Sequence, residues 1–290
     1  MRRFVLLAAA ILSSTALAQP AAPPPPEPAR APGEVALAPS RFELLMTPGG
    51  SQTVVVNVIS SGSAAEPLRL LASLGDWTMT PAGEMQFSEP GSNPRSATPW
   101  LIYSPVEFAV EGGQSYPIRV TLDVPKDASP GDHTAVLFVE QRPRDIKTQH
   151  GEKQITFHFR LAAVFYVMIQ PLTHQGSLTA LEATATPAGI TLTPTLHNEG
   201  NSHLRPVQSF EILDGAEQVV ASQAKSETYP VLGGTDYRPA LKLDRALPPG
   251  EYSLRYHVDF RDGSNKVVEG RKALTVPEAA PAKKAASKKH

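Results

Sequence analysis

The 290-residue sequence contains no cysteine. This absence excludes disulfides, thiolate metal sites, cysteine nucleophiles and a lipid anchor on cysteine. Positive and negative charges nearly cancel, with 27 Lys and Arg against 28 Asp and Glu, so the chain lacks the basic excess of a nucleic-acid-binding protein. No apolar run reaches the ~18 residues that a membrane-spanning helix needs. Each hydrophobic core must therefore form by packing alone.

Enzyme motifs are also missing. The sequence has no Gly-x-Ser-x-Gly elbow, and its Gly-Gly pairs precede strand-like segments instead of the helix that a phosphate-binding loop requires. His197 and His203 flank Glu199, but their spacing fits no zinc pattern and favours a solvated turn. We therefore predict a non-enzymatic protein with no metal ion or other cofactor.

The N-terminus has the features of an export signal. Two arginines precede the apolar residues 4–11, and Ala16-Leu17-Ala18 provides a small-x-small cleavage site. This predicts a signal peptide over residues 1–18, followed by a Pro-rich extended linker over residues 19–34. The mature chain is then exported to the periplasm, with the cell surface or secretion as open alternatives.

A turn-and-strand pattern occurs three times. Gly-Gly pairs at residues 49–50, 112–113 and 233–234 each precede a segment with an apolar residue at every second position. Glycine supplies the positive φ of a tight turn, and the alternation places one strand face on a core. The pattern predicts an all-β chain of two tandem immunoglobulin-like β-sandwich domains.

We place the first domain at residues 35–171 and the second at residues 172–277. Expected strands of the first domain include 53–59, 68–79, 100–103, 116–124, 133–139 and 154–170. Residues 83–96 are expected to form a loop, and Trp77 is expected to lie between the two sheets. In the second domain we expect a single strand at 237–243, among others. Residues 278–290 form an Ala/Lys-rich tail, predicted to be disordered, which offers a weak electrostatic contact with the envelope.

The last strand of the first domain carries the main candidate site. Ile155, Phe157, Phe159 and Leu161 alternate there with polar or small residues. Such a row is normally part of a core. The alternative is an exposed edge with an apolar row, open to pairing with another polypeptide.

Several segments resemble, in sequence order, a known family. Residues 75–78, 100–105, 107–115 and 124–133 resemble PapD-like periplasmic pilus chaperones, which have immunoglobulin-like domains in series. Residues 196–203 and 247–252 resemble immunoglobulin-like modules of bacterial cell-surface proteins.

The resemblance implies a partner-binding site. In this family the last strand of the first domain completes an unfinished pilin sandwich, and a basic pair in the interdomain cleft holds the pilin's terminal carboxylate. Arg41 matches the arginine of that pair, whereas the lysine has no counterpart, because Arg160 is the only basic residue of the strand. The matching apolar positions are Ile155, Phe157, Phe159 and Leu161.

Together, these observations predict a chaperone-like module that captures exported polypeptides, such as pilus or surface-fibre subunits, by β-strand addition. The apolar row would contact the partner, and Arg41 or Arg160 would pair with a partner carboxylate. The alternative is a structural or adhesive module of the cell envelope without chaperone activity.

Overall fold

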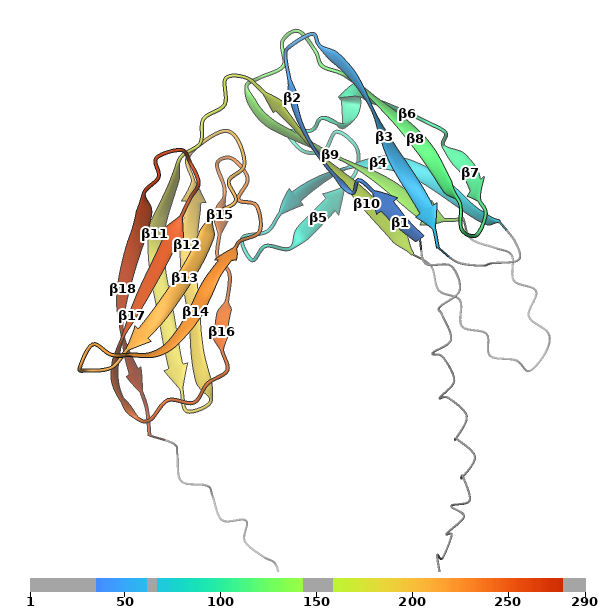
Figure 1. Ribbon diagram of the computed structural model, residues 1–290. Coiled ribbons are helices and arrows are strands. Elements are labelled where there is room, and N and C mark those ends of the chain that lie inside the picture. Colours follow the sequence, from blue (N-terminus) through green and yellow to red (C-terminus); the bar gives the residue numbers. More distant parts are fainter. Residues whose placement is uncertain (1–34, 62–66, 143–158, 279–290) are drawn as a thin grey trace, which may run out of the picture.

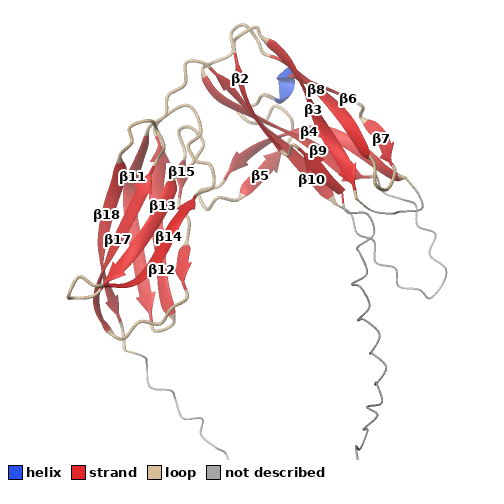
Figure 2. Ribbon diagram, viewed as in Figure 1, coloured by secondary structure: helices blue, strands red, loops and turns tan. Residues whose placement is uncertain are grey.

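The computed structural model describes residues 35–61, 67–142 and 159–278, which form strands, turns and one short 3-10 helix (Figures 1 and 2). The predicted signal peptide, the Pro-rich linker and all but Glu278 of the predicted tail lie outside these residues, as do Ile155 and Phe157. Within the described ranges, no helix has the length and hydropathy needed to cross a membrane.

The first domain consists of two sheets. One contains, in order, β1 (Val35–Ala38), β3 (Ser51–Ser60), β8 (Ser115–Asp123) and β6 (Leu101–Ser104). The other contains, in order, β2 (Arg41–Met46), β10 (Arg160–Ile169), β9 (Gly131–Gln141), β4 (Leu68–Met79) and β5 (Met85–Ser88), with β7 (Glu107–Val110) also paired to β4. A 3-10 turn, η1 (Thr98–Trp100), precedes β6.

The second domain repeats the two-sheet arrangement. One sheet contains β11 (Gly176–Thr186) and β12 (Gly189–Asn198), with the short strands β15 (Asp236–Tyr237) and β16 (Leu241–Leu243) both paired to β12. The other contains, in order, β14 (Val219–Glu227), β13 (Val207–Leu213), β17 (Gly250–Asp259) and β18 (Val267–Val276).

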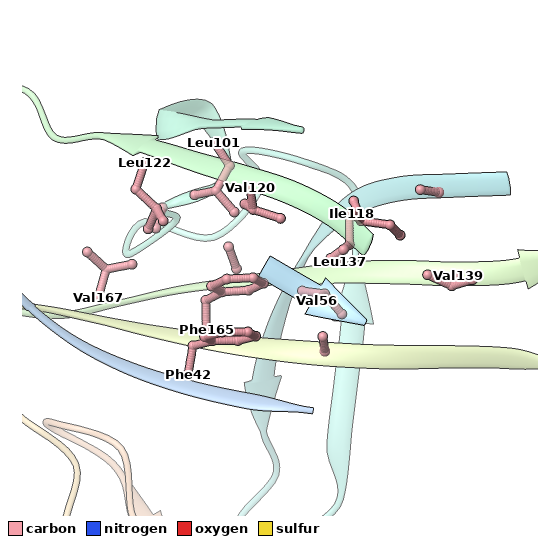
Figure 3. Packing of buried hydrophobic residues seen from close by; sticks show 14 of the residues in the cluster. Phe42, Val56, Leu101, Ile118, Val120, Leu122, Leu137, Val139, Phe165 and Val167 are labelled. Atoms are coloured by element: carbon pink, nitrogen blue, oxygen red, sulfur yellow. The ribbon is translucent and has the colours of Figure 1, made fainter. Parts of the chain in front are cut away.

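Apolar residues at alternate positions meet between the sheets of each domain. In the first domain the rings of Phe42 and Phe165 stack with centroids 4.7 Å apart, beside Val56, Ile118 and Leu137 (Figure 3). A separate cluster that includes Phe210, Leu254 and Tyr256 fills the second domain. Full burial of one such side chain contributes about 1.5–3 kcal/mol. The predicted all-β fold of two sandwich domains is confirmed.

The repeated Gly-Gly turns have the predicted backbone conformation. Gly49, Gly113 and Gly234 have φ values of 77°, 76° and 71°, and they precede β3, β8 and β15. The prediction of a single strand at residues 237–243 is wrong, because the structure has two separate strands there, β15 and β16. Pro239 lies between them and has no N–H for a ladder hydrogen bond.

Two predictions about the first domain are corrected. Residues 83–96 are not entirely loop, since they contain β5. Trp77 is fully buried but does not lie between the two sheets. Leu70 and Ala72 of β4 point into the first core. Successive side chains of a strand point to opposite faces, so the odd-numbered Trp77 points to the other face of the sheet.

Candidate strand edge and domain interface

The first two described strands belong to different sheets, and part of β10 is left without a partner strand in the described ranges. β1 pairs with β3 in one sheet, and the chain then crosses at Pro39 to form β2 in the other sheet. β2 runs parallel to β10 but pairs with it only from Val164 to Ile169. On the β2 side of residues 160–163, no strand of the described ranges pairs with β10. We call this side of β10 the open edge.

The backbone groups of two residues point toward the open edge. The N–H of Val164 donates to the carbonyl of Ser40 at 2.9 Å, which places even-numbered residues of β10 toward β2. The carbonyl of Phe159 accepts a hydrogen bond from the N–H of Gln141, the last residue of β9, which places the backbone groups of odd-numbered residues toward β9. The N–H and C=O groups of Arg160 and Ala162 therefore face the open edge. Such groups are a template for another strand.

The structure divides the predicted site residues between two faces of this sheet. Phe159 and Leu161 are half-buried on the face toward the first core, and Phe159 packs against that core. Arg160 and Arg41 lie on the opposite face, which we call the outer face. The two arginines are not brought together, because Arg41 is opposite Val164, four residues along the strand from Arg160.

Among the described residues, Arg41 and Arg160 each have one weak ion pair. Nε of Arg41 lies 3.4 Å from Glu43, and Nε of Arg160 lies 3.5 Å from Glu140. The Arg160 guanidinium also covers the ring of Phe138, 3.6 Å from its centroid. All four charged side chains are exposed, so these pairs contribute about 0–1 kcal/mol. A partner carboxylate can therefore compete for either arginine.

A shallow hollow adjoins the open edge on the outer face. Its lining combines apolar side chains of β5 and β10 with the start of β2: Met85, Ala162, Val164, Pro39, Ser40 and Arg41. Arg41 is the one charged residue in this lining.

A buried carboxylate joins the two domains. Asp132 Oδ1 accepts a hydrogen bond from Ser202 Oγ at 2.7 Å, and Asp132 Oδ2 accepts from the N–H and the Nδ1 of His203, each at 2.6 Å. The side chains of Asp132 and His203 are only 5% and 7% exposed. Hydrogen bonds to a charged group are each worth about 1.5–3 kcal/mol, so this network fixes the interface.

An apolar cluster on the outer face completes the interface. Trp77, Val136, Phe138, Val164 and Tyr166 of the first domain pack with Leu232 of the second. Burial raises the pKa of Tyr166, while the nearby guanidinium of Arg205 has an opposing effect. The Nη2 of Arg205 also donates to Glu43 at 2.9 Å.

The sequence alone did not reveal the residues of the domain interface. His203 was expected in a solvated turn, but it is buried against Asp132 and its ring lies 4.3 Å from that of Tyr166. The turn residues themselves were visible as Pro130-Gly131-Asp132 and as residues 198–203. Their partnership was not visible, because 70 residues separate Asp132 from Ser202 and no spacing rule covers such a distance.

Comparisons with known proteins give structural matches only. No family model and no curated protein matches the chain. Among solved structures, a chain of the chaperone–tip adhesin complex of CFA/I fimbriae is 12% identical, with a TM-score of 0.43 over 82% of this chain and 98% of that one. The CupB2 chaperone of Pseudomonas aeruginosa is 12% identical, with a TM-score of 0.40 over 82% and 100%. The DraB chaperone of E. coli is 12% identical, with a TM-score of 0.39 over 82% and 98%.

These solved structures include fimbrial chaperones, the family that the sequence resembles.

Proposed function

We propose that this chain is an exported, non-enzymatic module that captures a partner polypeptide by strand addition at the open edge of β10. The observation that carries the proposal is the change of sheet between β1 and β2, which leaves the backbone groups of Arg160 and Ala162 without a partner strand in the described ranges. Main-chain hydrogen bonds to these groups would supply affinity, and side-chain contacts would supply selectivity.

Arg41 suits the end of such a partner strand. A strand that continues the line of β2 and runs parallel to β10 would have its C-terminal end beside Ser40 and Arg41. Arg41 has one weak ion pair among the described residues and is exposed, so a terminal carboxylate would find a cation there. Arg160, at the other end of the open edge, is the second candidate for a partner carboxylate.

The partner class follows from the sequence. The signal peptide predicted at residues 1–18 places the partner among exported proteins, and the resemblance to pilus chaperones suggests pilus or surface-fibre subunits. Ile155 and Phe157, outside the described residues, remain proposed partner contacts together with Phe159 and Leu161.

One observation favours the alternative, a structural or adhesive envelope module. Phe159 packs against the first core, so at least this member of the apolar row contributes to the domain itself. Replacing Phe159 would therefore disturb folding as well as binding, and a sharper probe is a residue whose backbone faces the open edge.

Substitution of Ala162 tests strand addition. Ala162→Pro removes the N–H that faces the open edge and leaves the ladder with β9 intact, because odd-numbered residues make that ladder. The control Ala162→Ser keeps the N–H. The probe is a fluorescent ten-residue peptide with apolar residues at alternate positions and a free C-terminal carboxylate.

We expect the peptide to bind wild type and Ala162→Ser, and to bind Ala162→Pro about fivefold more weakly, as the loss of one hydrogen bond implies. Fluorescence anisotropy measures the affinity. Hydrogen exchange should show bound peptide protecting the amides of Arg160 and Ala162. Equal binding to all three proteins, or no protection of these amides, would favour the structural module instead.

A further inference from the structure

The β4–β5 hairpin lies over the outer face of the first domain. β4 pairs with β9 through Leu70–Gly75 and with β5 only through its last residues, Asp76–Met79. In a flat sheet β5 would lie three strands away from β10, yet Met85 of β5 lines the hollow together with Ala162 of β10. Figure 1 shows β5 on the side of the first domain that faces the second. The hairpin is therefore bent back over β9 and β10.

Contacts at both ends hold the hairpin in this place. Near its base, the ring of Phe87 meets the ring of Phe138 edge-on, with centroids 5.0 Å apart. At its tip, the N–H of Arg238 in the second domain donates to the carbonyl of Pro81 at 2.5 Å. Met85 lies between these contacts. It therefore has a fixed place in the lining of the hollow, which also includes Pro39, Ser40 and Arg41.

The hollow lies where one face of an added strand would project. Side chains of a strand at the open edge alternate between the two faces of the sheet. Those on the inner face would meet Phe159 and Leu161, and those on the outer face would lean over Ala162 toward Met85. Apolar side chains therefore adjoin both faces of a strand in this position.

We propose that the hollow between Met85 and Arg41 receives the outer-face side chains of the added strand, so that the partner segment is continuously apolar up to the carboxylate that the proposed function puts beside Arg41. This inference rests on strand addition at the open edge. Strands buried on both faces are continuous apolar runs, whereas strands with one solvated face alternate. Three features select such an occupant. Backbone groups without a partner strand in the described ranges suit an added strand, and the mainly apolar lining suits apolar side chains. The exposed guanidinium of Arg41 suits a carboxylate.

Two peptides that differ only on the outer face test the proposal. Both have valines at the positions facing Phe159 and Leu161, two N-terminal lysines for solubility and a free C-terminal carboxylate. One has alanine or valine at the outer-face positions and the other has serine. We expect the continuously apolar peptide to bind wild type about tenfold more tightly, because it removes additional apolar surface from water.

Substitution of Met85 links this preference to the hollow. Met85→Asp introduces a charge into the lining and should reduce the tenfold preference to less than about twofold. Met85 is 40% exposed, so the substitution leaves the core intact. The matched control is Ile102→Asp in β6, which alters a 66% exposed side chain of the other sheet and should retain the full preference.

The outcomes separate this inference from the proposed function. If both peptides protect the Arg160 and Ala162 amides and bind with equal affinity, the proposed role of the hollow is contradicted, whereas strand addition is supported. If the Met85→Asp variant still prefers the continuously apolar peptide about tenfold, the proposed role of the hollow is also contradicted. Protection of these amides by neither peptide would overturn both proposals. If the free protein forms a dimer and Met85→Asp abolishes this dimer, the hollow binds a second copy of the chain. This result would also contradict the inference.

Discussion

At the scale of single residues, His133 is a buried imidazole whose surroundings favour the neutral form. Its Nε2 donates to the carbonyl of Ser129 at 2.9 Å, and its Nδ1 is buried with no hydrogen-bond partner among the described residues. Protonation would place an unsatisfied N–H and a charge in this site. Burial, assisted by the charge of Arg95, lowers the pKa of His133 below its usual value of 6.5.

This lowered pKa makes the stability depend on pH. The unfolded chain binds the proton first as the pH falls through 6.5, so the contribution of His133 is complete above that pH and decreases from 6.5 down to the folded pKa. The free energy of unfolding falls by about 1.4 kcal/mol for each tenfold difference in the proton affinity of His133 between the folded and unfolded states. Urea midpoints over a pH series should therefore fall more steeply for wild type than for His133→Gln. The exposed control His174→Gln should follow wild type, and identical slopes in all three proteins would contradict the assignment.

At the scale of elements, the β4–β5 hairpin depends on a glycine at its tip. Gly83 has φ = +88°, and a Cβ there would lie 2.7 Å from Cε2 of the buried Tyr237 and 3.0 Å from Tyr229. Gly113 has a similar φ of +76°, but a Cβ there would meet no heavy atom of the described residues within 4 Å. The two glycines share a backbone requirement and differ in their surroundings.

We expect Gly83→Ala to be more destabilising than Gly113→Ala. The positive φ alone costs each variant about 1–2 kcal/mol, and the clash with Tyr237 should add about 1 kcal/mol or more at residue 83. Urea unfolding measures the difference. Gly83→Ala should also reduce the binding preference for the continuously apolar peptide, because the hairpin that carries Met85 is displaced. Equal free energies of unfolding for the two variants would show that the tip of the hairpin is not held by the second domain.

At the scale of the whole molecule, the arrangement of the domains depends on Asp132. Its carboxylate accepts three hydrogen bonds from Ser202 and His203, and the backbone N–H of Asp132 donates to the carbonyl of Asn201 at 2.9 Å. Leu232 adds apolar contact with the cluster around Trp77. Because the β4–β5 hairpin also touches the second domain, the domain arrangement determines part of the lining of the hollow.

Removal of the carboxylate should loosen the two domains. Asp132→Ala leaves three donors without their acceptor, and we expect a loss of about 3 kcal/mol together with a larger radius of gyration. The control is Asp236→Ala, which breaks a partly exposed pair with His197 and should cost less than about 1 kcal/mol. Small-angle X-ray scattering and thermal unfolding provide the two measurements. The same radius and the same midpoint in both variants would show that Asp132 does not join the domains.

The local structure could be predicted from the amino-acid sequence. Alternation of apolar residues predicted strands such as β4 and β8, and the Gly-Gly pairs predicted turns whose glycines have positive φ. These predictions succeed because a strand face and a tight turn depend on residues close together in the chain. Alternation also placed Phe159 and Leu161 on one face and Arg160 on the other.

Which sheet face packs against which other element depends on how distant segments of the chain fold together. Alternation could not tell that Trp77 points away from the first core, since both faces of its sheet are buried there. The open edge beside Arg41 exists because β1 and β2 belong to different sheets, and the hollow exists because β5 folds back toward Ala162. The hydrogen bonds from His203 to Asp132 join residues that are too far apart in the sequence for a local pattern to predict their contact. Each of these features comes from chain segments that are distant in sequence and meet only when both domains have packed.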